Sequence, residues 1–154
     1  MIPRFGQPPE PGRAYRLRPG AYGLLIREGR ALLTRRSDDD ELQLPGGGID
    51  PGESPPRALA REVFEETGWN IGAPRRIGVY RRFTFMPDYG FWAEKLCHVW
   101  IARPLFRRAD PIEPLHMPEW VLLKDLPDAV DETGARDFLR LRLRRRSRLA
   151  QERW

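Results

Sequence analysis

The chain has 154 residues, of which 40% are hydrophobic and 32% are charged, and its formal net charge at pH 7 is +5. This length suits one domain and is too short for two ordinary ones. Collagen-like, coiled-coil and disulfide-framework classes are excluded, because there is no glycine period, no sustained heptad and no second cysteine beside Cys97. No apolar run approaches the roughly 18 residues of a membrane span, and the N-terminus lacks the apolar stretch of a signal peptide. We therefore expect a soluble, cytoplasmic protein with no membrane partner.

The two ends of the chain differ from its middle in composition. Prolines cluster within residues 1–12, which are predicted to form a flexible, extended arm. Residues 134–154 contain eight arginines against two acidic residues, a net charge of +6, so the other 133 residues sum to −1. We expect one domain over residues 13–133, with residues 134–154 as an arginine-rich helix or tail that packs on it or extends from it.

Strands are predicted on both sides of one central helix. Apolar runs at residues 21–26 and 31–34 flank the turn signal Glu28-Gly29, which indicates a hairpin. Residues 42–44 alternate briefly before the glycines at 46–48, where a strand is expected to stop. Residues 76–85, 91–102 and 120–123 are further strand candidates. Residues 135–149 alternate leucine with arginine but hold no β-branched residue, and a helix is predicted there.

The clearest element is a helix that begins after Ser54 and ends at Gly68. Ser54 is a good N-cap, Pro55 suits the first helical position, and Gly68 suits the residue past the end. At 100° per residue an apolar side and an opposite acidic side are predicted; the apolar side holds Leu59, Ala60, Val63 and Phe64, and the acidic side holds Glu62, Glu65 and Glu66. Strands around a helix, followed by a last helix, indicate a mixed α/β domain.

Three carboxylates within reach of one point repel each other unless a cation lies between them. Hard oxygen ligands favour magnesium, manganese or calcium over zinc. The glycines at 46–48 allow a ligand to approach the backbone closely. The alternative is a solvated acidic helix face, balanced by Arg57 and Arg61.

The spacing of residues 47–69 favours the metal site. They satisfy G-x5-E-x7-R-E-U-x-E-E-x-G-U, in which U is a bulky apolar residue. By chance this pattern occurs in fewer than roughly one in 10⁵ chains of this length. It resembles the Nudix box, the signature of the Nudix hydrolase family, and departs from it only at Trp69, where an aliphatic residue is usual. The resemblance, which extends loosely from Ala21 to Leu126, implies an α/β/α sandwich around a mixed central sheet.

The resemblance also implies roles for individual residues. Glu62 and Glu66 match the principal metal ligands, Glu65 matches a further one, and the Gly46 carbonyl matches a backbone ligand; the expected ion is Mg²⁺, with Mn²⁺ as a substitute. Arg61 and Glu53 match the ion pairs that orient these carboxylates. The catalytic base is either Glu62 or a glutamate outside the box, for which Glu94, Glu113 and Glu119 are candidates. Glu113 lies on the favoured loop.

Residues outside the box add further candidates. Arg36 and Arg35 end the second predicted strand, where the resemblance implies an arginine, preferably Arg36, that contacts substrate phosphate; the alternative is a solubilising charge. Aromatic residues could stack a base or simply pack the strands; they are Phe83, Phe85, Tyr89, Phe91 and Trp92. Cys97 and His98 are adjacent on a strand, so they are expected to face opposite sides. His116 is a lone loop histidine without an assigned partner.

The function implied by the resemblance is metal-dependent hydrolysis of a nucleoside diphosphate linked to another group. A nucleoside triphosphate or modified nucleotide is the preferred substrate. The alternatives are an ADP-ribose or nucleotide-sugar pyrophosphatase, an RNA 5′-pyrophosphohydrolase, and a regulatory module that binds nucleotides without turnover. The basic tail is interpreted first as a solvated amphipathic helix, second as an extension that binds nucleic acid or polyphosphate, with a weak RNA contact, and last as a membrane-surface element, because its apolar side is thin. A homodimer is left open.

Overall fold

The computed structural model describes residues 1–151 and, in the last helix, side chains as far as Arg145. A seven-stranded mixed sheet forms its centre, with the order β3-β2-β1-β7-β6, in which β4 also pairs with β1 and β9 with β2. Its strands are β1 (Arg16–Arg27), β2 (Arg30–Arg36), β3 (Leu42–Gln43), β4 (Gly46–Gly48), β6 (Arg75–Met86), β7 (Phe91–Ala102) and β9 (His116–Leu122). The long central pair β1–β7 is parallel, whereas its neighbours are antiparallel. The predicted mixed sheet is confirmed.

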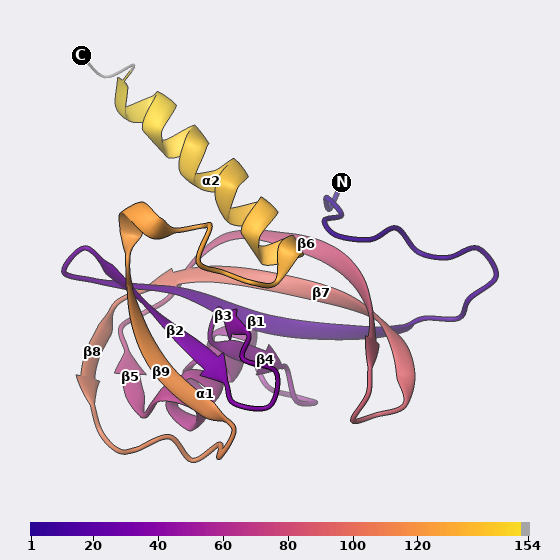
Figure 1. Ribbon diagram of the computed structural model, residues 1–154, viewed down its shortest axis with the longest axis horizontal. Helices are drawn as coiled ribbons and strands as arrows, with labels where there is room; N and C mark the ends of the chain where they lie inside the picture. Colours follow the sequence, from indigo (N-terminus) through magenta and orange to yellow (C-terminus); the bar gives the residue numbers. More distant parts are fainter. Residues whose placement is uncertain (152–154) are drawn as a thin grey trace.

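Two helices cover opposite faces of this sheet (Figure 1), as the neighbours of adjacent β1 residues show. Leu25 packs with residues of α1 (Pro55–Thr67), and Leu24 packs with residues of α2 (Thr133–Gln151). Adjacent strand residues point to opposite faces, so α1 and α2 lie on different sides. The expected α/β/α sandwich is therefore the observed fold. No helix within residues 1–151 has the length and apolar character needed to cross a bilayer.

The capping signals of α1 act as predicted. Ser54 Oγ accepts the Arg57 N–H, and Gly68 ends the helix in the left-handed region with φ +76°, where its N–H reaches the Phe64 carbonyl. The predicted division of α1 into an apolar side and an opposite acidic side is wrong in detail. Ala60 is exposed, while Glu66 is buried beside Leu59. The acidic side adjoins the buried side, because Glu66 follows Leu59 by seven residues, or almost two whole turns.

The strand expected at 42–44 stops before the glycines, as predicted, because β3 ends at Gln43, but the glycines at 46–48 then form a strand of their own, β4. Gly46 lies opposite Tyr22 and Gly48 opposite Gly20. A Cβ at Gly46 would approach the Ala21 carbonyl oxygen to 2.2 Å, and its φ is +147°, so only glycine fits. A second small sheet, β5 (Trp69–Ile71) with β8 (Pro104–Arg107), was absent from the sequence prediction.

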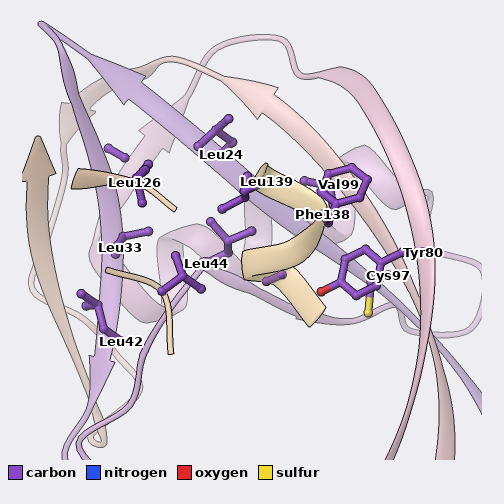
Figure 2. Close-up of a cluster of buried hydrophobic side chains, with 13 residues drawn as sticks. Leu24, Leu33, Leu42, Leu44, Tyr80, Cys97, Val99, Leu126, Phe138 and Leu139 are labelled. Atoms are coloured by element: carbon purple, nitrogen blue, oxygen red, sulfur yellow. The ribbon is translucent and has the colours of Figure 1, made fainter. Parts of the chain in front are cut away.

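The predicted C-terminal helix is confirmed as α2, which follows a short 3₁₀ helix (Leu123–Asp125). Figure 2 shows Phe138 and Leu139 of α2 among Leu24, Val99 and Tyr80 of the sheet. The expected flexible arm, residues 1–12, is tied to the sheet at residues 3–5. There the Arg81 N–H donates to the Pro3 carbonyl, and the Phe5 N–H donates to the Arg81 carbonyl. The fold therefore holds both ends of the domain on the α2 side.

Candidate active site

One cavity of about 310 Å³ gathers residues from β1, β4, α1, β9 and the loop before β9. Among its lining residues are several of the predicted site residues, namely Arg36, Gly46, Glu62, Glu66 and Glu113. The fold therefore joins the end of β2 and the loop before β9 to the box, although these segments are far apart in the sequence. Four other predicted residues, Arg35, Glu53, Arg61 and Glu65, lie outside this lining.

Glu66 and Glu62 place two carboxylates at the inner side of α1. The Glu66 side chain is 6% exposed, and its Oε2 accepts the Gly46 N–H at 3.2 Å. Burial raises the pKa of Glu66 well above its ordinary value, and burial also raises the pKa of Glu62 despite the opposing charge of Arg61. A Cβ at Gly47 would lie 2.7 Å from Glu62 Cδ, so this glycine makes room for the Glu62 carboxylate.

Arg61 links the helix to the loop that precedes it. Its Nε and Nη2 donate to the two oxygens of Glu53 at 2.8 and 2.9 Å, and Nη2 also reaches the Gly48 carbonyl at 3.1 Å. Its Nη1 donates to Glu62 at 3.0 Å and to Glu65 at 3.3 Å. The hydrogen bonds from Arg61 lower the pKa of Glu53 to about 2. One guanidinium thus holds the orientation of three carboxylates.

The donors in the cavity fit a hard divalent cation. Glu62, Glu66 and Glu113 supply carboxylate oxygens to one cavity, and burial, with a smaller contribution from the neighbouring carboxylates, raises the pKa values of Glu62 and Glu66. Among the described residues no three acidic, histidine or cysteine side chains are gathered closely enough to hold a metal ion. Arg61 donates hydrogen bonds to one oxygen each of Glu62 and Glu65.

The glutamates proposed as alternative bases occupy different positions. The backbone N–H of Glu113 donates to the Glu65 carbonyl at 3.0 Å, which fixes its loop against the C-terminal end of α1. Glu119 is bound by Arg35, with Nε at 2.8 Å, and Glu94 lies 3.4 Å from Arg81. Of the three, only Glu113 lines the cavity.

The two arginines at the end of β2 separate in the structure. Arg36 lines the cavity, and its Nε donates to Asp38 at 3.1 Å. Arg35 instead forms two hydrogen bonds with Glu119 and one with the Asp40 carbonyl. Both arginines are therefore paired with carboxylates outside the cavity, Arg35 with Glu119 and Arg36 with Asp38 through Nε and Nη2, and of the two only Arg36 lines the cavity.

The structure adds His116 to the site, which sequence reasoning left without a partner. Its Nδ1 lies 3.0 Å from Thr34 Oγ1 and 3.9 Å from Glu66 Oε2. Burial lowers the pKa of His116, which favours the neutral imidazole. His116 begins β9 opposite Arg36 of β2. No local signal could reveal that pairing, because it joins residues 80 positions apart.

Tyr22 and Lys95 also line the cavity and were missed. The Lys95 ammonium lies 5.4 Å from the Tyr22 ring centroid. The Tyr22 phenol raises the pKa of Lys95, so that the lysine stays charged although it is largely enclosed. The alternation of residues along β7 gave a signal for Lys95, because Ala93, Lys95 and Cys97 share one face of that strand. Ala93 and Cys97 are buried. An inward lysine between two core residues is a candidate ligand contact.

Comparisons with known proteins agree with this geometry. A model of the NUDIX domain matches residues 16–141. A putative 8-oxo-dGTP diphosphatase of Bacillus subtilis (strain 168) is 43% identical over 70 residues, which cover 45% of this chain and 47% of that protein. An RNA pyrophosphohydrolase of Yersinia pestis (strain Pestoides F) is 50% identical over 50 residues, which cover 31% and 29%. The matches thus span less than half the length of these relatives.

Solved structures match over more of the chain. The MutT protein from Methanosarcina mazei Go1 has a TM-score of 0.67 and 26% identity, and the match covers 86% of this chain and 96% of that one. A MutT NUDIX hydrolase from Burkholderia pseudomallei gives a TM-score of 0.62 at 26% identity, with coverages of 77% and 93%. With the box folded into a loop and helix that line one cavity, and a domain match over most of its length, the chain belongs to the Nudix family.

Proposed function

We propose that the protein is a pyrophosphohydrolase that cleaves a nucleoside diphosphate linked to another group, with a nucleoside triphosphate or modified nucleotide as the preferred substrate. The observation that carries this proposal is that two carboxylates, Glu62 and Glu66, line one cavity together with Arg36. The acidic groups would hold a cation, and a cation-bound phosphate is the ligand that a nearby arginine would bind. The relatives named as diphosphatase and pyrophosphohydrolase support the same reaction class.

Nudix hydrolases generally use divalent metal ions. In this chain we assign Glu62 and Glu66 as ligands, with Glu65 and the Gly46 carbonyl as further ones, to Mg²⁺ or its substitute Mn²⁺. The bound ion would neutralise pyrophosphate oxygens and acidify a water. Arg61 and Glu53 would keep the carboxylates aimed at it.

The chain's own residues account for the remaining steps. Arg36 and Lys95 would bind phosphate oxygens, because both cations line the same cavity. A carboxylate must accept the proton of the attacking water, and Glu62 and Glu113 are the two candidates in reach. Tyr89, exposed at the rim with Arg18 4.9 Å from its ring centroid, is placed to stack a base. The proposal includes a cytoplasmic location, with which the free thiol of Cys97 is compatible.

The test is a panel of nucleotide pyrophosphates with Mg²⁺ and with Mn²⁺. It holds nucleoside triphosphates, oxidised nucleotides, ADP-ribose and nucleotide sugars, and released phosphate or pyrophosphate is measured for the parent and for Glu113→Gln. We expect hydrolysis by the parent and a loss of about 100-fold in the variant if Glu113 is the base. Binding of nucleotides without any turnover would instead support the regulatory module.

An RNA 5′-pyrophosphohydrolase is the second candidate. It is favoured by the RNA pyrophosphohydrolase relative at 50% identity and by the eight arginines after residue 133. The same residues would act on the 5′ phosphates, with the RNA chain held outside the cavity. Release of pyrophosphate from 5′-triphosphorylated RNA, compared with release from free nucleoside triphosphate at equal concentration, distinguishes the two candidates.

A further inference from the structure

A groove of about 320 Å³ runs between α2 and the beginning of β6, on the face of the sheet that α2 covers. Its floor includes Ile77 and Leu139, and four arginines line it, namely Arg75, Arg76, Arg142 and Arg145. We call this the basic groove. No part of the catalytic proposal uses it.

The positive charge of the basic groove is not balanced within the described part of the chain. None of its four arginines has a carboxylate oxygen within 4.0 Å there, whereas Arg140 of the same helix lies 2.7 Å from Asp128. Four cations around an apolar floor repel each other unless an anion lies among them. The groove therefore offers charge complementarity to a ligand with several negative charges.

Arg142 is held in place by packing and not by an ion pair. Its guanidinium carbon lies 5.3 Å from the centroid of the Phe138 ring, and a Cβ at Gly78 would come within 2.6 Å of its Nη2. Its buried Nε has no hydrogen-bond partner among the described residues. A guanidinium that packing already holds in place loses little further side-chain entropy when it binds an anion.

Strand β6 connects the basic groove with a smaller cavity beside the catalytic cavity. A smaller cavity of about 140 Å³ shares Tyr22 and Lys95 with the catalytic cavity and also touches Tyr80 and Arg82 of β6. The groove begins further along the same strand, at Arg76. Arg76 lies six positions before Arg82, which corresponds to about 20 Å along the strand. The buried, stacked rings of Tyr80 and Phe138 separate the smaller cavity from the groove, so a chain-like ligand that reaches both sites passes around α2 and not beneath it.

We infer that the basic groove binds the backbone of a single-stranded RNA near its 5′ end. Guanidinium groups pair with phosphates and stack on unpaired bases, and the apolar floor suits sugar and base surfaces. A lipid surface fits less well, because Phe138 and Leu139, on the apolar side of α2, are already buried against the sheet. The claim that the 5′ end reaches the catalytic cavity rests on the proposed function; binding in the groove does not.

The test compares two variants of the full chain. Arg76→Gln combined with Arg145→Gln removes two exposed charges of the groove, while Arg144→Gln removes an exposed charge of the same helix outside the groove lining. The probe is a short fluorescent RNA with a 5′-hydroxyl, and its binding is followed by anisotropy over a series of salt concentrations. We expect the double variant to bind about tenfold more weakly and to lower the salt slope by about 1.4, at about 0.7 per phosphate contact. Arg144→Gln should bind within about twofold of the parent.

A 5′-hydroxyl RNA carries no pyrophosphate, so binding is measured independently of catalysis. Equal affinities of the parent and the double variant would overturn the groove assignment. So would binding of the parent to vesicles containing anionic phosphatidylserine without binding to the RNA. If the double variant loses RNA affinity while the parent hydrolyses no substrate, the groove stands and the proposed function fails.

Discussion

Glu66 illustrates how burial and function oppose each other at a single residue. Its carboxylate is enclosed, it accepts one backbone hydrogen bond, and burial raises its pKa. A carboxyl whose pKa is raised in the folded state makes the protein less stable as pH rises above the ordinary value of 4.5. The charge at this position is therefore a cost to the metal-free fold, which a bound cation would offset.

Glu66→Gln should remove nearly all hydrolysis while leaving the metal-free protein at least as stable as the parent. The amide keeps the size of the side chain and can still accept the Gly46 N–H, but it brings no charge to a cation. Since changes behind a metal ligand already cost about 10–100-fold, loss of a ligand should exceed about 100-fold. Turnover is measured together with melting at pH 8, with and without Mg²⁺. Normal turnover with a normal metal requirement would contradict the assignment.

Arg61→Lys should lower kcat by about 10–100-fold with little change in KM. Arg61 donates hydrogen bonds from its three nitrogens to Glu53, Glu62 and Glu65 at once. A lysine ammonium cannot reproduce this planar arrangement of donors. Arg57→Lys, on the exposed side of the same helix, is the matched control and should leave both constants unchanged. A large rise in KM at unchanged kcat would instead make Arg61 a substrate contact.

At the scale of elements, the start of α2 depends on Glu132. Its carboxylate accepts the N–H groups of Gly134 and Ala135 at 2.6 Å each and the Tyr80 hydroxyl at 3.1 Å, and it pairs with Arg82 at 2.7 Å. Burial acts to raise the pKa of Glu132, but Arg82 and the two N–H groups outweigh it and hold that pKa below its ordinary value. One side chain thus fastens α2 to β6.

Removing this carboxylate should make the fold less stable and less sensitive to acid. Because the pKa of Glu132 is lower in the folded protein than its ordinary value of 4.5, the ionised carboxylate stabilises the fold above about pH 4.5. This stabilisation is lost as the pH falls through the folded-state pKa. Glu132→Ala should cost about 2–3 kcal/mol at pH 7, from a lost cap and an unpaired Arg82. Glu132→Gln should show a shallower loss of stability below about pH 5 than the parent. Urea unfolding at several pH values measures both, with Asp137→Asn, an exposed residue of α2, expected to match the parent.

At the scale of the whole molecule, the arginine-rich segment divides near Arg140. Phe138 and Leu139 are buried in the core beside Tyr80, and the family match ends at residue 141. The residues before Arg140 therefore belong to the folded domain, while Arg142 and Arg145 after it line the basic groove.

Deleting the residues after Arg140 should leave hydrolysis of free nucleotides within a few-fold of the full chain, because none of the residues whose side chains the structure describes there, 141–145, lines the catalytic cavity. The same deletion should abolish the groove's RNA affinity. Replacing Phe138 with alanine should instead lower the free energy of unfolding by about 3–5 kcal/mol. Hydrolysis and unfolding are measured on the full chain, on the chain truncated after Arg140 and on Phe138→Ala. A truncated protein that is folded but inactive on every free nucleotide would place the tail in the active site.

Sequence spacing determined the parts of the site that lie within one element. Ser54, Pro55 and Gly68 defined α1 because caps act over single turns, and the i, i+3, i+4 spacing brought Glu62, Glu65 and Glu66 together. The long antiparallel pair β6–β7 also followed from its residue types and turn. These signals act between residues that are close in the sequence, so the sequence alone was enough to predict these elements.

Only the tertiary structure decided which of those residues face the cavity and what faces them. Glu66 is buried because α1 packs on the sheet, His116 reaches it because β9 pairs with β2, and Arg36 enters while Arg35 is bound by Glu119. Strand β4 and the basic groove likewise join segments with no shared periodicity. Such contacts depend on strand order and register across the whole sheet, and local propensity carries no information about either. The sequence by itself therefore determined the box and its helix, and the packing of the sheet decided the cavity.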